Sequence, residues 1–163
     1  MTEAPPAPLH ITLAEVQSRV GQEIAVSPWV EVPQALIERF AEVSRDDQWI
    51  HVDPERAARE SPFKNADGQG VTVAHGFLTV ALLTHLRFSS FVIDGVRSSI
   101  NMGFDKLRFT APVPSGGRIR ARFKLGEAYE AGGGVQLVWN VTVELEGSKR
   151  PVLLADWLTR VMP

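Results

Sequence analysis

The stretch from Gly76 to Leu86 constrains the fold more than any other part of this chain. Its side chains are apolar almost all the way round a helix of about 3.6 residues per turn. In a soluble chain such a helix is buried on most of its faces, and the apolar run is shorter than the roughly 20 residues that span a bilayer. Other parts of the sequence must therefore wrap around this helix.

The second half of the chain supplies this wrapping as a series of strands. Two of its segments alternate between apolar and polar side chains, which is the pattern of a strand with one buried face. A run of three glycines between these two segments is suited to a turn. The predicted strands are 97–109, 119–125, 135–145 and 152–161, with the turn at 132–134.

The outward face of the second of these strands is basic. If the pairing is centred near Gly132, Arg120 lies opposite Glu144 and Arg118 lies opposite Glu146. These cross-strand pairs partly neutralise the stripe. We therefore interpret it as a solvated charged face, the alternative being an anion-binding surface.

The first half of the chain mixes helices with one strand. Thr12 and Glu15 have the spacing of a capping box, which predicts a short helix after Thr12. Residues 23–32 are predicted to form a strand, Pro33 to open a helix of about ten residues, and Asp53 to cap a further helix. With the second half, this predicts an α+β fold in which a mostly antiparallel sheet curls around one buried helix.

Length and composition narrow the class of protein. The 163 residues fit one domain, predicted over residues 11–163 after a Pro-rich disordered leader at 1–10. The absence of cysteine excludes disulfides, thiolate nucleophiles and zinc fingers. The 17 Lys and Arg against 19 Asp and Glu are too balanced to indicate a nucleic acid or a membrane as partner. We expect a cytoplasmic protein that relies on oxygen or nitrogen chemistry.

Asp46 and His51 are the first candidates for that chemistry. They are five positions apart, about 140° around an α-helix, so they converge only if the segment from Ser44 to Asp53 is an irregular loop. A carboxylate and an imidazole that meet at one water can deprotonate it and return the proton in a later step. The alternatives are a purely structural segment and a metal site formed by Asp46, His51 and Asp53.

A second candidate lies where Gly76 opens the apolar helix, directly after His75. A helix N-terminus presents unpaired amide donors, and a glycine lets a ligand approach the backbone closely. Gly76 is therefore either part of an oxyanion hole or only a glycine needed for tight entry into the helix. The sequence has no P-loop, serine-hydrolase or dinucleotide-binding motif.

The segment Ser44–Asp53, followed by Val73–Leu78, resembles the hydratase motif of the MaoC-like dehydratases and (R)-specific enoyl-CoA hydratases. Residues 48–57, Gln-Trp-Ile-His-Val-Asp-Pro-Glu-Arg-Ala, resemble the branch related to the nodulation protein NodN. The resemblance implies a hot-dog fold, in which an antiparallel sheet wraps a long central helix. It also implies an acyl-CoA substrate, no metal or organic cofactor, and a homodimer or higher oligomer with each active site near the subunit interface.

Carried over residue by residue, the resemblance implies that Asp46 and His51 activate a water and that the Gly76 amide binds the thioester oxygen. The implied enzyme is a hydro-lyase that adds water reversibly and syn to trans-2-enoyl-CoA, giving (R)-3-hydroxyacyl-CoA. The alternatives are a hot-dog acyl-CoA thioesterase and a non-catalytic acyl-thioester-binding module. The residues expected to bind substrate or to support the catalytic pair are Gln48, His75 and Thr84.

The chain departs from the family pattern in two places. Arg45 stands where glycine is common, which places a positive charge beside Asp46 unless the side chain points to solvent. The loop over residues 60–71 is longer than usual, and a longer loop can reshape the entrance for the acyl chain or CoA.

Overall fold

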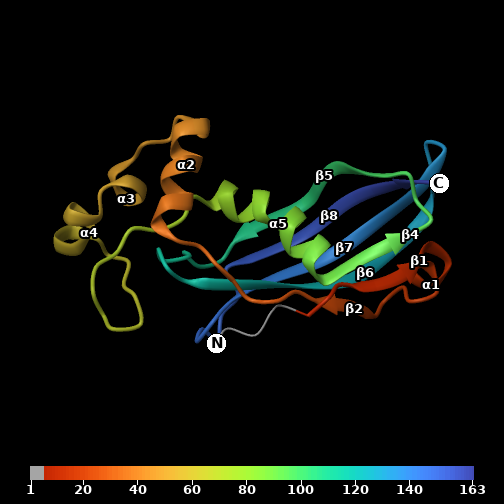
Figure 1. The fold of residues 1–163 in the computed structure, drawn as a ribbon, viewed down its shortest axis with the longest axis horizontal. Helices are drawn as coiled ribbons and strands as arrows, with labels where there is room; N and C mark the ends of the chain where they lie inside the picture. Colours follow the sequence, from red (N-terminus) through yellow and green to blue (C-terminus); the bar gives the residue numbers. More distant parts are fainter. Residues whose placement is uncertain (1–5) are drawn as a thin grey trace.

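A computed structural model describes residues 6–163 as one sheet with a long helix lying along it (Figure 1). The main sheet is antiparallel in the order β2-β6-β7-β8-β5, with the short β3 also pairing with β6. The helix is α5 (Gly76–Ser90), so the predicted α+β arrangement of an antiparallel sheet around a helix is confirmed. The strands of this sheet are β2 (Glu23–Val26), β3 (Val30–Glu31), β5 (Ser98–Phe109), β6 (Arg118–Ala131), β7 (Gly134–Leu145) and β8 (Leu153–Met162).

Strands β6 and β7 pair in the predicted register. Arg120 lies opposite Glu144, and its Nε donates to the Glu144 carboxylate at 2.6 Å. Arg118 donates from Nη1 to both carboxylate oxygens of Glu146 at 3.1 Å. The basic stripe on β6 is therefore matched by carboxylates, which is the cross-strand pairing expected from the sequence.

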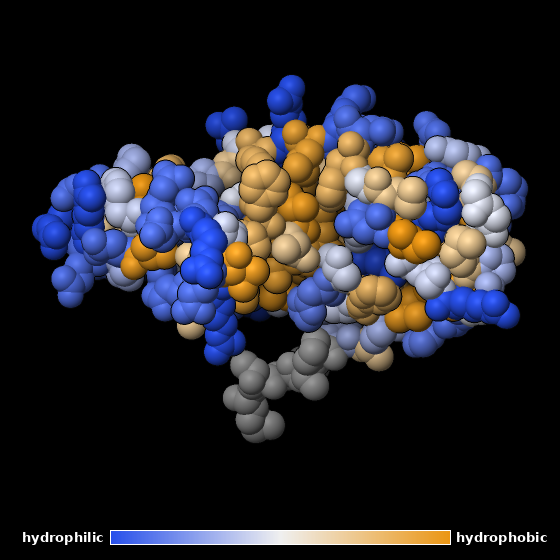
Figure 2. All heavy atoms as spheres, turned by 90° about the horizontal axis from the view of Figure 1, so that it is seen from above, coloured by the Kyte–Doolittle hydropathy of each residue, from blue (hydrophilic) through white to orange (hydrophobic). Residues whose placement is uncertain are grey.

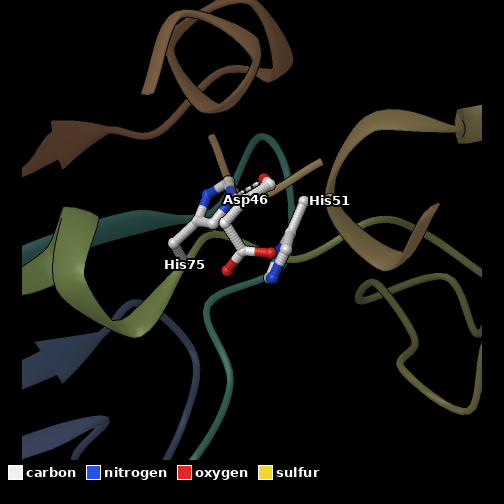
Figure 3. A group of neighbouring side chains, drawn as sticks. All are labelled: Asp46, His51 and His75. Atoms are coloured by element: carbon white, nitrogen blue, oxygen red, sulfur yellow. Dashed lines mark hydrogen bonds between the residues drawn. The ribbon is translucent and has the colours of Figure 1, made fainter. Parts of the chain in front are cut away.

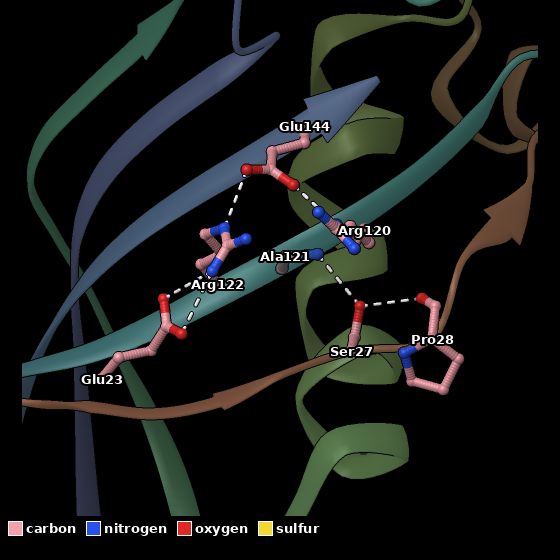
Figure 4. Close-up of polar contacts among 7 residues, drawn as sticks. All are labelled: Glu23, Ser27, Pro28, Arg120, Ala121, Arg122 and Glu144. Carbon is pink, nitrogen blue, oxygen red and sulfur yellow. Dashed lines mark hydrogen bonds and ion pairs between the residues drawn. The ribbon is translucent and has the colours of Figure 1, made fainter. Parts of the chain in front are cut away.

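The single strand predicted over residues 23–32 is wrong, because the structure has two strands, β2 and β3, with Ser27 and Pro28 between them. Proline has no N–H for the ladder to β6. The buried Ser27 compensates: its Oγ accepts a hydrogen bond from the Ala121 amide at 3.0 Å and donates to the Pro28 carbonyl at 2.9 Å (Figure 4).

Arg122 of β6 joins three strands, since it lies between Glu23 of β2 and Glu144 of β7 (Figure 4). Its Nε donates to Glu144 at 2.8 Å, and its Nη1 donates to Glu23 at 3.0 Å. Hydrogen bonds to Glu144 and Glu23 raise the pKa of Arg122. Burial acts to raise the pKa of Glu144, but hydrogen bonds from Arg122 and Arg120 outweigh it and hold that pKa below its usual value.

The long helix α5 is buried on one side only. Phe77, Ala81, Thr84 and Phe88 recur at i, i+4, i+7 and i+11 and are exposed, so the expected burial on most faces is wrong for a single copy of the chain. The sheet covers the opposite side of the helix. Figure 2 shows hydrophobic side chains gathered in a broad band between more hydrophilic ends. The exposed large apolar residues of α5 and of the edge strand β5 are Phe77, Phe88, Ile100, Met102 and Phe109.

A second, parallel pair of strands lies at the N-terminal side: β1 (Leu9–Thr12) with β4 (Phe91–Asp94). The expected disordered leader over residues 1–10 is therefore wrong for Leu9 and His10, which belong to β1. The His10 ring Nδ1 also lies 2.9 Å from the Asp94 carboxylate. Residues 6–8 belong to no helix or strand, and residues 1–5 lie outside the described residues.

Two of the remaining helices begin at the caps that the sequence predicts, and a third begins directly after Pro33. The capping box of Thr12 and Glu15 is present, and Asp53 accepts a hydrogen bond from the Arg56 amide. No helix of the described residues is long and apolar enough to cross a membrane. These helices are α1 (Leu13–Gln17), α2 (Gln34–Ser44), α3 (Trp49–Val52) and α4 (Pro54–Glu60).

Arg87 of α5 is a buried cation that the sequence patterns did not indicate. Only 3% of it is exposed, and its Nε has no hydrogen-bond partner within residues 6–163. The guanidinium lies over the rings of Phe88 and Phe91, at 4.6 and 5.0 Å from the ring centroids. Burial lowers the pKa of Arg87 to about 10.

Candidate active site

Asp46 and His51 lie on the chain between α2 and α4. Helix α2 ends at Ser44, and Arg45 then takes a left-handed conformation with φ 62°, which turns the chain back. The expectation of an entirely irregular loop is wrong, because His51 belongs to the four-residue helix α3. The irregular part is confined to the residues around Asp46, and this is enough to bring Asp46 and His51 together.

The His51 ring is fixed by its contact with the chain just before α5. Its Nδ1 donates to the Val73 carbonyl at 2.6 Å, and the Val73 amide donates to the carbonyl of Ile50 at 2.9 Å. A carbonyl can only accept, so Nδ1 carries the proton and Nε2 of the neutral ring is an acceptor. The side chain is buried, which limits its rotation.

Gln34 and Thr72 hold the backbone of His51 from the other side. The Thr72 hydroxyl donates to the Gln34 Oε1 at 2.5 Å, and the Gln34 Nε2 donates to the His51 carbonyl at 2.9 Å. Thr72 is buried, and Gln34 opens helix α2. Sequence reasoning missed this pair, since the two residues are 38 positions apart and belong to no motif.

His75 stacks on His51, with ring centroids 3.7 Å apart and an angle of 24° between the planes. Its Nε2 lies 2.8 Å from the backbone carbonyl of Asp46 and donates to it, the contact drawn in Figure 3. The ring of Phe40 packs against His75 at 5.1 Å. His75 therefore contacts both Asp46 and His51, through one backbone hydrogen bond and one ring stack.

The Asp46 carboxylate is directed at the His51 ring (Figure 3). Gln48 donates from Nε2 to the Asp46 Oδ1 at 3.2 Å, which is the supporting contact expected for Gln48. Asp46 is partly exposed, whereas both histidines are buried. A carboxylate at the mouth of a buried pair of imidazoles can hold a water between itself and His51.

Asp46, His51 and His75 are also the residues that could hold a metal ion, because one ligand atom of each lies within 4.8 Å of the others. Imidazole lone pairs point outward in the plane of the ring, and a first-row ion bound by nitrogen sits about 2.0–2.1 Å away. In a face-to-face stack the two sets of lone pairs run side by side and do not converge. Asp53, the third ligand considered from the sequence, is committed to capping α4.

Gly76 is the first residue of α5, and its N–H has no hydrogen-bond acceptor within residues 6–163. The Phe109 ring of β5 covers it closely, since a Cβ on residue 76 would lie 2.8 Å from the ring. A side chain at residue 76 would therefore require the Phe109 ring to move. Beside it is a groove of about 370 Å³ whose lining includes Gly76, Thr79 and Phe109 but neither Asp46 nor His51.

Two residues singled out in the sequence lie elsewhere. Thr84 is exposed on α5, eight residues past Gly76 and so about 12 Å further along the helix. Arg45 is exposed and lines a groove with Glu38, Glu42 and Asp47. Neither is brought to the Asp46 and His51 pair.

Known proteins resemble this chain over most of its length. Residues 15–145 match the family model of the MaoC like domain. Nodulation protein N of Rhizobium leguminosarum bv. viciae is 45% identical, over 92% of this chain and 91% of that protein. The 3-hydroxyacyl-thioester dehydratase Z of Mycobacterium tuberculosis (strain ATCC 25618 / H37Rv) is 42% identical, over 91% of this chain and 95% of that one.

The fold is also found among solved structures. The (R)-hydratase from A. caviae involved in PHA biosynthesis superimposes with a TM-score of 0.63 at 23% identity, covering 88% of this chain and 96% of that one. This confirms the hot-dog fold. The family match covers far more than half of the chain and includes every residue of the site. This chain therefore belongs to the family of MaoC-like domains.

Proposed function

We propose that this protein adds water reversibly to trans-2-enoyl-CoA and gives (R)-3-hydroxyacyl-CoA. The observation that supports this most is the meeting of the Asp46 carboxylate and the buried His51 ring beside the N-terminus of α5. Membership of a family of dehydratases and hydratases supports a hydro-lyase. The geometry offers each group that the reaction requires.

The water is held by two acceptors. Asp46 is a carboxylate, and the Nε2 of His51 is an acceptor because Nδ1 is bonded to Val73. One water can donate a hydrogen to each and turn a lone pair of its oxygen toward Cβ of the substrate. As the bond from oxygen to Cβ forms, the water loses one proton to this pair, which then delivers that proton to Cα.

Addition at Cβ moves negative charge onto the thioester oxygen. The Gly76 N–H has no acceptor of its own in the described residues, and it lies at the positive end of the helix dipole of α5. Such a donor is in place before the charge develops, so it stabilises the transition state more than the ground state. Because water and proton arrive from the same pair, the addition is syn.

We also propose that the working unit is a homodimer. In it, a second copy covers the exposed stripe of α5, which is formed by Phe77, Ala81, Thr84 and Phe88. At its N-terminal end this stripe contacts the edge strand β5, where the ring centroids of Phe77 and Phe109 lie 6.1 Å apart, and both elements expose large apolar side chains. A second copy on this face would close the site over Asp46. Sedimentation of the wild-type protein and of Phe88→Asp tests this, with a dimer expected for the first and a monomer for the second.

The test of the reaction is to mix the protein with crotonyl-CoA and to follow both the enoyl absorbance and free thiol. Loss of the enoyl signal without thiol is expected, and release of thiol would instead establish a thioesterase.

Asp46→Asn should lower kcat by about 10²- to 10⁴-fold, as for loss of a general base. Wild-type activity in Asp46→Asn would refute the mechanism. Activity is expected to survive exhaustive chelation, and its loss would revive the metal site.

A further inference from the structure

The loop that we expect to be longer than usual for the family is an ordered hairpin. The Ser61 hydroxyl donates to the Val71 carbonyl at 2.8 Å, and the Val71 amide donates to the Phe63 carbonyl at 3.1 Å. At its tip, the Asn65 Oδ1 accepts hydrogen bonds from the amides of Asp67 and Gln69. The hairpin 61–71 therefore presents its outer side chains in defined positions.

The base of the hairpin is locked under helix α4. Gly70 passes so close to the carbonyl oxygens of Ala57 and Ala58 that a side chain on residue 70 would collide with them. A short bridge also pairs Lys64 with Gly70 across the hairpin. The hairpin thus has a fixed orientation relative to the helices that carry the site.

This hairpin forms one wall of two grooves that adjoin each other. The apolar groove of about 370 Å³ beside Gly76 is lined by Phe63 and by residues 109–113. The next groove, of about 510 Å³, is lined by residues 64–67 and 114–118. Since 63 is followed by 64 and 113 by 114, the two grooves lie next to each other along the same two segments, and we refer to them together as the path. The lining of the path is apolar at the Gly76 end and more polar at the outer end.

The outer groove contains a cation that is not used by a carboxylate. Arg118 is paired with Glu146, whereas Lys64 has no ion pair within residues 6–163. Asp67 lies in the same groove. Lys149 and Arg150 follow just beyond, where a neighbouring groove shares residues 145, 147 and 148 with this one. Within residues 6–163, the cations without an ion pair at this end are Lys64, Lys149 and Arg150, and the carboxylate without one is that of Asp67. Unpaired positive charge therefore exceeds unpaired negative charge here.

We propose that this path binds the carrier arm of the thioester and that Lys64 contacts a phosphate of that arm. The inference rests on the proposed function, because the thioester oxygen is placed at Gly76. The pantetheine portion is long and uncharged and suits the inner groove, while the phosphate at its far end suits an unpaired ammonium. A phosphopantetheine arm is common to CoA and to acyl-carrier proteins, so Lys64 recognises the chemistry that the two share.

The test compares substrates with and without the phosphate. Lys64→Gln is expected to raise the KM for crotonyl-CoA about three- to tenfold, with kcat unchanged, and to weaken its dependence on salt. The KM for crotonyl-pantetheine, which has no phosphate, is expected to stay the same. Lys124→Gln removes the same charge from β6 at a position that lines neither groove, and it should change neither value.

An equal effect of Lys64→Gln on both substrates, or none on either, would overturn the proposal. A crotonyl-acyl-carrier-protein substrate distinguishes which phosphate Lys64 contacts. If Lys64→Gln raises the KM for both the CoA and the carrier-protein thioester, the contact is with the phosphate of the shared phosphopantetheine arm. If it raises the KM for the CoA thioester alone, the contact is with the nucleotide phosphates of CoA. Calorimetric binding of free CoA and of pantetheine is independent of turnover. If Lys64→Gln weakens only CoA binding while no thioester is hydrated, the phosphate contact stands and the proposed reaction fails.

Discussion

His51 and His75 stack face to face at 3.7 Å, yet each binds the backbone of a different segment. His51 donates from Nδ1 to the Val73 carbonyl beside α5, and His75, beside α5, donates from Nε2 to the carbonyl of Asp46. The two rings therefore cross-link the chain before α4 to the start of the long helix in both directions. The stack holds the Asp46 segment against the start of α5, where the Gly76 N–H lies.

His75→Phe should separate the effect of the ring stack on kcat from the effect of the hydrogen bond to Asp46. Phenylalanine keeps a flat ring against His51 but cannot donate to the Asp46 carbonyl, so we expect kcat for crotonyl-CoA to fall about tenfold with little change in KM. His85→Phe, at an exposed position of the same helix, is the matched control. An unchanged kcat in His75→Phe would show that the contact does not position Asp46.

Gly76→Ala should act through Phe109. The new Cβ would lie 2.8 Å from the ring, and because that ring is 48% exposed it can move aside into the groove. We expect the fold to persist and the KM for crotonyl-CoA to rise about three- to tenfold, since the displaced ring obstructs the thioester. The double variant Gly76→Ala, Phe109→Ala should recover part of this loss. No recovery would place the effect at the amide itself.

Thr72→Val should loosen His51 without changing the shape of the core. It removes the hydroxyl that donates to Gln34 and leaves a partly buried acceptor unpaired, which costs about 1–2 kcal/mol in the free energy of unfolding. Urea denaturation measures this, and kcat is expected to fall in parallel. Thr72→Ser keeps the hydroxyl and should stay near wild type in kcat; if it behaves like valine, packing and not the hydrogen bond is responsible.

Arg45→Gly should stabilise the protein. Arg45 is the one non-glycine residue of the described range 6–163 with a positive φ, a conformation that costs an L-residue about 1–2 kcal/mol. Glycine removes this strain but loses more conformational entropy on folding, so we expect a net gain of about 0.5–1 kcal/mol by urea denaturation. Arg45→Ala removes the same charge and keeps the strain, so it should give no gain. A gain in both variants would point to charge instead.

Glu144→Gln should make the free energy of unfolding less dependent on pH in the acid range. The folded pKa of Glu144 lies below its unfolded value, so its contribution is complete above the unfolded pKa of about 4.3 and is lost as the pH falls through the lower folded value. We expect Glu144→Gln to be less stable by about 1 kcal/mol at pH 7, and we expect this difference to shrink as the pH falls below the unfolded pKa of Glu144. Urea midpoints between pH 7 and pH 3 measure this. Parallel profiles would contradict it.

Local patterns in the sequence predict most of the fold. The alternation in β6 and β7 and the glycines between them set the register, which is why the pairing of Arg120 with Glu144 is correct. The caps at Thr12 and Asp53 are also local and are confirmed. The break at Pro28 was missed, because alternation continues across it while the ladder to β6 does not.

The site is less predictable because its contacts are long-range. Asp46, His51 and Gly76 could be predicted from their types and from the family resemblance, and the structure brings Asp46 and His51 together near the start of α5. No local signal points to Gln34, whose role depends on a threonine 38 positions away. Thr84 was expected beside the pair, but helical geometry carries it about 12 Å from Gly76 along α5.

Helix α3 has only four residues and no side-chain cap, so it is far below the roughly 12–15 residues at which a helix persists alone. Its shape depends on a few hydrogen bonds to α2 and to Val73, none of which belongs to the main sheet. This segment can therefore open while the sheet stays folded, and amide hydrogen exchange at His51 would report that opening. We therefore expect activity on heating to be lost by local unfolding of α3, at a temperature below the melting of the protein as a whole.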